Sequence, residues 1–273
     1  SSGGGLARHL LTDKRVEALV VEIARGGLFK FGLGLDFADG AIVTCIDDNH
    51  VGFDGITTRE QMARVKGVVA QVASRIVVLN ADDPLVLAMA HGRDPQTIAL
   101  VGCDPGAAAL QRHRQVGGLV ALFDTSPDGW IRLYRGDVLL MQICLSEIPA
   151  SQGGAVMALA PASAFALALA VGLGQDPQQL GLQLRSFGLD LIHNAGRFER
   201  LVQKPLELVL TWADGEKAVT SVSHYAKMRS QQKTFRRKLL LLSAPNKRGD
   251  AYIQAMGAST GSFDQVFCAE WYL

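Results

Sequence analysis

Residues 17–55, EALVVEIARGGLFKFGLGLDFADGAIVTCIDDNHVGFDG, carry the strongest signal of the fold. Two apolar runs, residues 19–21 and 41–46, each end in side chains that can bind a metal. Glu22 closes the first run, and the Asp-Asp-Asn-His sequence of residues 47–50 closes the second. In a parallel α/β sheet, ligands bind outside the carboxyl ends of the strands. A carboxylate and an imidazole at two such ends therefore predict a divalent cation beside a nucleotide phosphate.

The first two thirds of the chain alternate between strand and helix patterns. Uninterrupted apolar runs with β-branched residues predict buried strands, and a 3.6-residue apolar period predicts helices. Beyond residue 116, short alternating runs separated by turns predict an antiparallel meander at the edge of the sheet. The predicted strands are residues 18–22, 41–46, 76–80 and 97–101, the meander is residues 119–123, 130–134 and 138–143, and the helices are residues 58–74, 85–91, 156–173 and 177–187.

A second alternation follows a predicted linker at residues 190–197. Its predicted strands are residues 207–211, 238–243 and 265–269, and its predicted helices are residues 218–230 and 250–261. This order predicts a small, mostly parallel α/β domain. We therefore expect an α/β protein with a parallel-sheet central domain over residues 1–192, truncated at its N-terminus, and a smaller Rossmann-like domain over residues 193–273.

Composition excludes several classes of partner. With 27 Lys and Arg against 26 Asp and Glu, the net charge of +1 offers no electrostatic footprint for nucleic acid or an acidic membrane. Residues 155–173 are too rich in Ala and Gly for a membrane span. The four cysteines are widely scattered, which predicts reduced thiols and a cytoplasmic protein. The sequence leaves open whether the chain forms a homo-oligomer.

Three motifs resemble the Mur ligase family, most closely its cyanophycin synthetase branch. They are Glu22 with the Ala-Arg-Gly-Gly of residues 24–27, the His-Val-Gly-Phe-Asp-Gly of residues 50–55, and the Asn-Ala-Asp-Asp-Pro turn of residues 80–84. The resemblance implies ATP and Mg²⁺ as cofactors. It also implies an amino acid or peptide substrate whose carboxylate is phosphorylated and then attacked by an amine. The turn at residues 80–84 is interpreted as structural.

The resemblance also assigns roles to individual residues. Glu22 and His50 match the family's magnesium ligands, and Lys66 matches a helix Lys that some members carry in carbamylated form. In the Asn-Ala-Gly-Arg-Phe-Glu stretch, Asn194 and Arg197 match nucleotide-contacting positions, with Arg197 expected at the phosphates. The positions matching the family's last nucleotide loop are Lys247, Arg248 and Asp250.

Each assignment has a plainer alternative. Glu22 is then a solvated residue or a helix cap, and Lys66 a solvated helix Lys. Arg197 makes an interdomain salt bridge, although its planar fork suits phosphate better than Lys would. The last group, residues 247–250, caps a helix.

Departures from the family pattern favour other functions. No G-x-x-x-x-G-K-[ST] phosphate loop occurs in the 273 residues, so we expect a fragment or a diverged member. Cys45 and Asn49 stand where the family has Asn and Asp, and residues 211–215 lack the family's Asp and His. The alternatives are a non-catalytic Mur-like binding or assembly module, or another Mur-like ligase such as a folylpolyglutamate or poly-glutamate synthetase.

Overall fold

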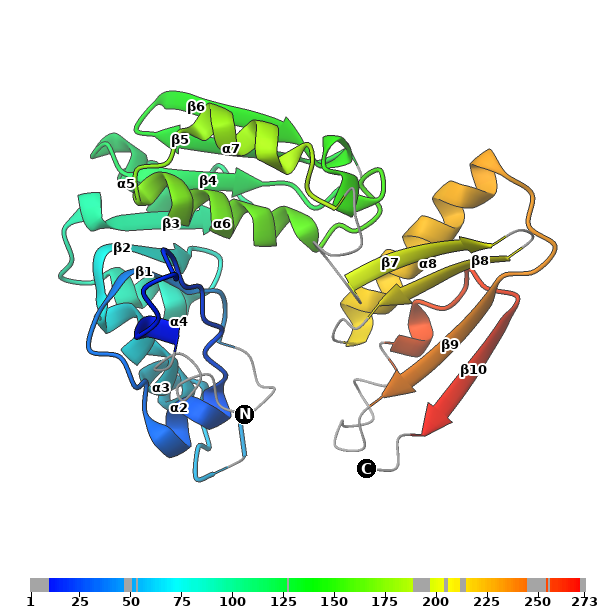
Figure 1. Cartoon of the computed structure of the whole chain (residues 1–273), viewed down its shortest axis with the longest axis horizontal. Coiled ribbons are helices and arrows are strands. Elements are labelled where there is room, and N and C mark those ends of the chain that lie inside the picture. Colours follow the sequence, from blue (N-terminus) through cyan, green and yellow to red (C-terminus); the bar gives the residue numbers. More distant parts are fainter. Residues whose placement is uncertain are drawn as a thin grey trace. The chain divides into compact units, whose positions relative to one another are not determined.

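The computed structural model describes residues 10–46, 51–52, 54–126, 128–188, 197–203, 206–211, 215–244, 254 and 256–270. For Arg197, residues 215–218, residues 243–244 and Glu270 it describes the backbone alone. The chain divides into two compact units (Figure 1). The first comprises Ser1–Phe123, Ile131–Gln142 and Pro161–Leu180, and the second comprises Asp124–Trp130, Ile143–Ala160 and Gly181–Leu273. The predicted boundary at residues 192/193 lies outside the described residues and stays a prediction.

A single mixed sheet contains the first six strands in sequence order. They are β1 (Ala38–Val43), β2 (Ala73–Asn80), β3 (Ile98–Gly102), β4 (Leu119–Phe123), β5 (Trp130–Arg135) and β6 (Val138–Cys144). Strands β1 to β4 pair in parallel, and β5 pairs antiparallel with β4. The predicted α/β class, the parallel strands and the antiparallel edge are therefore confirmed. Strands β3 and β4 are buried at every position, as the interior of a parallel sheet requires.

The helices described in this part of the chain are α2 (Arg25–Phe31), α3 (Arg59–Gln71), α4 (Pro84–Leu87), α5 (Ala108–Gln115), α6 (Leu159–Gly172) and α7 (Pro177–Leu184), with the 3₁₀ turns η2 (Ala88–Ala90), η3 (Pro95–Thr97), η4 (Leu145–Glu147) and η5 (Pro149–Ser151). Helices α3, α4 and α5 connect the parallel strands, and the other helices precede or follow the sheet. Side-chain caps fix where α3 and α7 begin. The Thr58 hydroxyl accepts from Gln61 N at 3.2 Å, and Asp176 accepts from Gln178 N at 2.9 Å. Both caps stand at the starts that the sequence predicted.

The strand predicted at residues 18–22 does not form. These residues have no regular secondary structure, and Val20 is 91% exposed. The four apolar residues between Glu17 and Glu22 are too few to bury much surface or to form many ladder hydrogen bonds. Glu22 is consequently exposed and does not stand at a strand end. The Ala-Arg-Gly-Gly stretch of residues 24–27 enters helix α2 at Arg25.

Helix α6 packs on the sheet through two glycines, and Figure 1 shows α6 and α7 lying across it. A Cβ at Gly40 of β1 would lie 2.5 Å from Leu169 Cδ1 on α6. A Cβ at Gly172 would lie 2.5 Å from Ile76 Cγ1 of β2. Because no side chain intervenes at either contact, helix and strands approach closely. No described helix is long and apolar enough to cross a membrane.

The second unit contains two small sheets and a long helix. Strands β7 (Arg197–Gln203) and β8 (Leu206–Thr211) form an antiparallel hairpin, and β9 (Leu239–Ala244) pairs in parallel with β10 (Gln265–Glu270). Helix α8 (Gly215–Gln232) supplies apolar side chains to both clusters that cover these sheets. The predicted strands β8, β9 and β10 are present. Strand β7 was not predicted, and most of the helix predicted at residues 250–261 lies outside the described residues.

We predict opposite effects on stability for alanine at two helix glycines. Gly172→Ala should lower the free energy of unfolding by about 1–3 kcal/mol because its Cβ meets the buried Ile76 side chain. Gly67→Ala in α3 should raise it by up to about 1 kcal/mol, since its Cβ comes no nearer than 3.6 Å to Met89 and alanine favours the helix. Urea denaturation measures both changes. Equal effects would contradict the close contact of α6 with β2.

Candidate functional site

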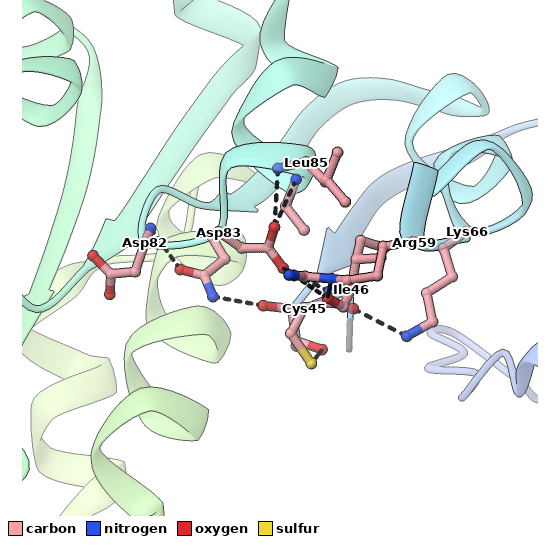
Figure 2. Close-up of polar contacts among 10 residues, drawn as sticks. Cys45, Ile46, Arg59, Lys66, Asp82, Asp83 and Leu85 are labelled. Carbon is pink, nitrogen blue, oxygen red and sulfur yellow. Dashed lines mark hydrogen bonds and ion pairs between the residues drawn. The ribbon is translucent and has the colours of Figure 1, made fainter. Parts of the chain in front are cut away.

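Asp83 fixes the backbone of the residues that follow β1. This buried carboxylate accepts a hydrogen bond from Ile46 N at 2.7 Å through Oδ2 (Figure 2). Its Oδ1 accepts from Leu85 N at 2.9 Å and from Val86 N at 3.3 Å, which caps α4. The Asp83 side chain therefore caps α4 and also holds Ile46, which lies just beyond β1 and 37 residues earlier in the sequence. The structural interpretation of the Asn-Ala-Asp-Asp-Pro turn is confirmed.

Two cations of α3 bind carbonyl groups in the same segment. Lys66 Nζ donates to Cys45 O at 3.0 Å, while Arg59 donates to Ile46 O through Nε at 3.0 Å and Nη2 at 2.5 Å (Figure 2). Arg59 Nη2 also lies 3.9 Å from Asp83 Oδ2. An ammonium group has three N–H donors. Lys66 is half-buried and uses one of its donors in the hydrogen bond to Cys45 O. Positive charge therefore stands at the carboxyl end of β1.

A chain of hydrogen bonds joins the carboxyl ends of three parallel strands. Asn80 at the end of β2 donates to Thr44 O, after β1, at 2.7 Å, and its Oδ1 accepts from Asp82 N at 2.9 Å. Asp82 Oδ2 in turn accepts from Cys103 N, just after β3, at 2.9 Å. These contacts fix the loops at the sheet edge where parallel α/β proteins bind ligands. Burial and the neighbouring Asp82 charge raise the pKa of the Cys103 thiol, which disfavours a nucleophilic role.

Two of the sequence motifs meet through an ion pair. Arg25 Nη1 donates to Asp54 Oδ2 at 2.5 Å, with the Arg25 side chain only 7% exposed. Asp54 has a left-handed φ of 53°, and the neighbouring Gly52 and Gly55 have φ of 94° and 78°. Glycine adopts such angles without strain. The Arg of the first motif therefore holds the turn that follows His50, a contact that sequence reasoning missed.

The predicted site residues have different outcomes. Lys66 lies at the carboxyl end of β1, as just described, whereas Glu22 is exposed in an irregular segment. Arg197 begins β7, where the structure describes its backbone alone. His50, Asn194, Lys247, Arg248 and Asp250 lie outside the described residues, so their roles stay predictions. Within the described part of the chain, no three His, Cys, Asp or Glu residues form a group that could hold a metal.

Arg59 is a site residue that sequence reasoning also missed. It occupies the first turn of α3, where the positive end of the helix dipole disfavours a cation. An Arg at such a position needs a specific partner, and here the partners are the Ile46 carbonyl and Asp83. A cation at the start of a predicted helix was therefore the feature of the sequence that could have identified Arg59 as a site residue.

In the second unit, Glu207 joins β7, β8 and α8. Its side chain, 7% exposed, accepts from Arg200 Nε at 3.0 Å, from Tyr225 Oη at 2.7 Å, and from Arg229 Nε and Nη2 at 3.2 and 3.1 Å. Burial alone would raise the pKa of Glu207, but the hydrogen bonds from Arg229, Tyr225 and Arg200 outweigh it and lower that pKa to about 2. Burial and the Glu207 carboxylate raise the pKa of Tyr225 to about 12. Glu207 is therefore a charged anchor throughout the physiological range.

Comparisons with known proteins give relatives along almost the whole chain. Cyanophycin synthetase of Crocosphaera subtropica is 31% identical over 274 residues, covering 99% of this chain and 30% of the relative. Cyanophycin synthetase of Synechocystis sp. is 34% identical over 213 residues, covering 74% of this chain and 24% of the relative. The chain thus spans less than a third of these relatives. No protein-family model matches it.

Solved structures give the same fold. MurF from Acinetobacter baumannii superposes with a TM-score of 0.52 at 13% identity, covering 84% of this chain and 46% of that one. A UDP-N-acetylmuramoyl-L-alanyl-D-glutamate–2,6-diaminopimelate ligase also gives 0.52, at 18% identity, covering 90% of this chain and 47% of that one. At these identities the likeness concerns the fold alone.

We predict that Asp83→Ala lowers the free energy of unfolding by about 2–4 kcal/mol, because it removes a helix cap and leaves the Ile46 N–H without its acceptor. Asp94→Ala is the matched control. Asp94 also precedes a proline and caps a helical turn by accepting from Gln96 N, but it is exposed. It should cost no more than about 1 kcal/mol in urea denaturation. Equal losses would show that the contact with Ile46 adds nothing.

The Glu207 pKa predicts a dependence of stability on pH. A carboxylate whose folded pKa is depressed stabilises the fold above its unfolded pKa and loses that contribution as pH falls through the folded value. Between pH 4.5 and about 2, the chain should therefore lose up to about 3 kcal/mol from this group. The difference in unfolding free energy between the wild type and Glu207→Gln should shrink across that window. A difference that stays constant would contradict the depressed pKa.

Proposed function

Since the chain is homologous to cyanophycin synthetases along almost its whole length and has a Mur-ligase-like fold, we propose that it takes part in ATP-dependent amide bond formation. In this reaction a substrate carboxylate oxygen attacks the γ-phosphorus of ATP, and ADP leaves. An amine then attacks the acyl carbon, phosphate leaves, and the amine loses a proton. The proposed substrates are an amino acid or peptide carboxylate and an amine, and the proposed setting is the cytoplasm.

The cationic carboxyl end of β1 supports this proposal most directly. Lys66 and Arg59 bring two positive charges to the ligand-binding edge of a parallel sheet. Fixed positive charge that is already oriented by the protein suits the anionic oxygens of phosphates. We assign Lys66 a catalytic role, in which its remaining donors neutralise charge on the transferred phosphoryl group. Arg59 orients the segment leading to residues 47–50, because both of its described contacts are with that segment and its anchor.

The described residues fit a nucleotide-bound magnesium ion better than a metal held by protein alone. Magnesium commonly keeps several waters and takes one or two carboxylates together with substrate phosphates. No described cluster supplies three protein ligands, whereas Glu22 is exposed to solvent and able to supply one. We propose Glu22 and His50 as the protein ligands. Bound magnesium would screen the phosphate charges.

In the second unit we propose that Arg197 contacts the phosphates, with Asn194, Lys247, Arg248 and Asp250 contributing to nucleotide binding. This rests on the matching motif positions and on the suitability of a guanidinium fork for phosphate oxygens. The second candidate function is a non-catalytic binding or assembly module. Cys45 favours it, since this exposed side chain replaces the family's Asn beside the Lys66 contact.

We predict that MgATP binds through the carboxyl end of β1. Titration should shift the backbone amide NMR signals of Cys45, Gly52 and Lys66. Lys66→Met should weaken the affinity about tenfold, the effect of losing one charge-assisted hydrogen bond. The control is Arg64→Met, which removes an exposed cation from the same helix and should change the affinity less than about twofold.

Three outcomes distinguish the proposed ligase from the non-catalytic binding module. Shifts confined to other surfaces, or equal losses in the two variants, would contradict the proposed nucleotide site. Binding accompanied by release of ADP when an amino acid and an amine donor are added supports the ligase. Binding without any amide product, measured by mass spectrometry, favours the binding module.

A further inference from the structure

Phe198 has a strained backbone conformation beside Arg197. Its φ is 63°, in the left-handed region that bulky L-residues rarely adopt, and its side chain is buried at 4% exposure. A conformation of this kind is unfavourable in itself and persists only where the surrounding structure holds it. Because aromatic burial alone does not require a left-handed backbone, the strain at this position needs another explanation.

The strain accompanies a β-bulge at the start of the hairpin. Arg197 pairs with Thr211, and Glu199 pairs with Leu210, so Phe198 is an extra residue opposite β8. A bulge bends its strand and turns the side chains next to it, and bulges often stand beside functional sites for this reason. The residue next to this bulge on the N-terminal side is Arg197.

Packing against α8 holds the bulge. The Phe198 ring meets the Tyr225 ring edge to face, with centroids 5.3 Å apart and an interplanar angle of 78°. Ala155 completes the buried cluster. Tyr225 is itself fixed, since its hydroxyl donates to Glu207 at 2.7 Å and that carboxylate also binds Arg200 of β7. The two strands and the helix therefore share one anchor, and Phe198 is fixed through it.

We propose that the Phe198 bulge, held by Tyr225 and Glu207, is a positioning device that fixes the backbone at Arg197 in the conformation needed for contact with an anionic ligand. Tyr225 and Glu207 are positioning residues, because they act on Arg197 through the backbone of β7. The inference rests on the proposed contact of Arg197 with nucleotide phosphates. The orientation of an Arg fork matters for bidentate contacts with phosphate oxygens, so a small rotation of its backbone weakens binding.

A double-mutant cycle tests whether Tyr225 acts through Arg197. Tyr225→Phe keeps the ring on Phe198 and removes the hydrogen bond to Glu207. It should weaken MgATP affinity about fivefold when Arg197 is present and less than about twofold in an Arg197→Met background. Lys227→Gln, an exposed change on the same helix, is the control and should leave the affinity unchanged in both backgrounds. Equal losses in the two backgrounds, or no loss from Tyr225→Phe, would overturn the proposal.

The backbone at residue 198 provides a readout that needs no nucleotide. Its HN–Hα coupling and Cβ shift in NMR should report the left-handed conformation in the wild type and in Tyr225→Phe. They should report an extended one in Tyr225→Leu, which removes the ring that holds it. A left-handed backbone at residue 198 in Tyr225→Leu would overturn the proposal that the Tyr225 ring holds the bulge. If the backbone responds as expected but Arg197→Met leaves MgATP affinity unchanged, the phosphate contact proposed for Arg197 is wrong, and the bulge does not serve nucleotide binding.

Discussion

The hydrogen bond between Asp83 and Ile46 N is the contact on which the geometry of the sheet edge depends. It joins a buried carboxylate at the end of β2 to the chain leaving β1, and the same carboxylate starts α4. A buried carboxylate without partners would cost several kcal/mol, so its three N–H donors must keep their places. Arg59 and Lys66 can bind the carbonyls of Cys45 and Ile46 because those groups are held still. The polar groups at this edge are therefore coupled through the backbone of one short segment.

Two polar networks among the described residues differ in how their charged groups are satisfied. Around Glu207, two guanidinium groups and a phenol surround one carboxylate whose side chain is almost wholly buried. A network of this kind fixes structure, because all its partners are internal. Near the end of β1, Lys66 instead binds a neutral carbonyl and stays half-buried. An ammonium with spare donors near solvent can still accept an anionic ligand, which is why this edge is the better candidate for chemistry.

Local patterns predicted the elements that are set by local interactions. The strands β2, β3 and β4 depend on local apolar runs, and the starts of α3 and α7 depend on the adjacent residues Thr58 and Asp176; the sequence predicted these strands and helix starts. Helix α5 was missed because its sequence AALQRHRQ is short and mostly polar and has no side-chain cap at Ala107. Strand β7 was missed because Arg, Glu and Gln interrupt its apolar positions. The strand forms through its backbone pairing with β8, which the apolar pattern of one segment does not reveal. The contacts Arg25–Asp54 and Arg59–Ile46 depend on distances between elements, which residue spacing does not specify.

The two units use the same physical means at different places in the fold. In each, a carboxylate from a neighbouring element fixes the backbone next to residues predicted to contact the ligand. Asp83 holds Ile46, directly before residues 47–50, and Glu207 holds Tyr225 against Phe198, directly after Arg197. In both places the anchor acts on the backbone beside the residues that are predicted to contact the ligand. A carboxylate that is satisfied by internal N–H and O–H donors keeps the adjacent backbone in place.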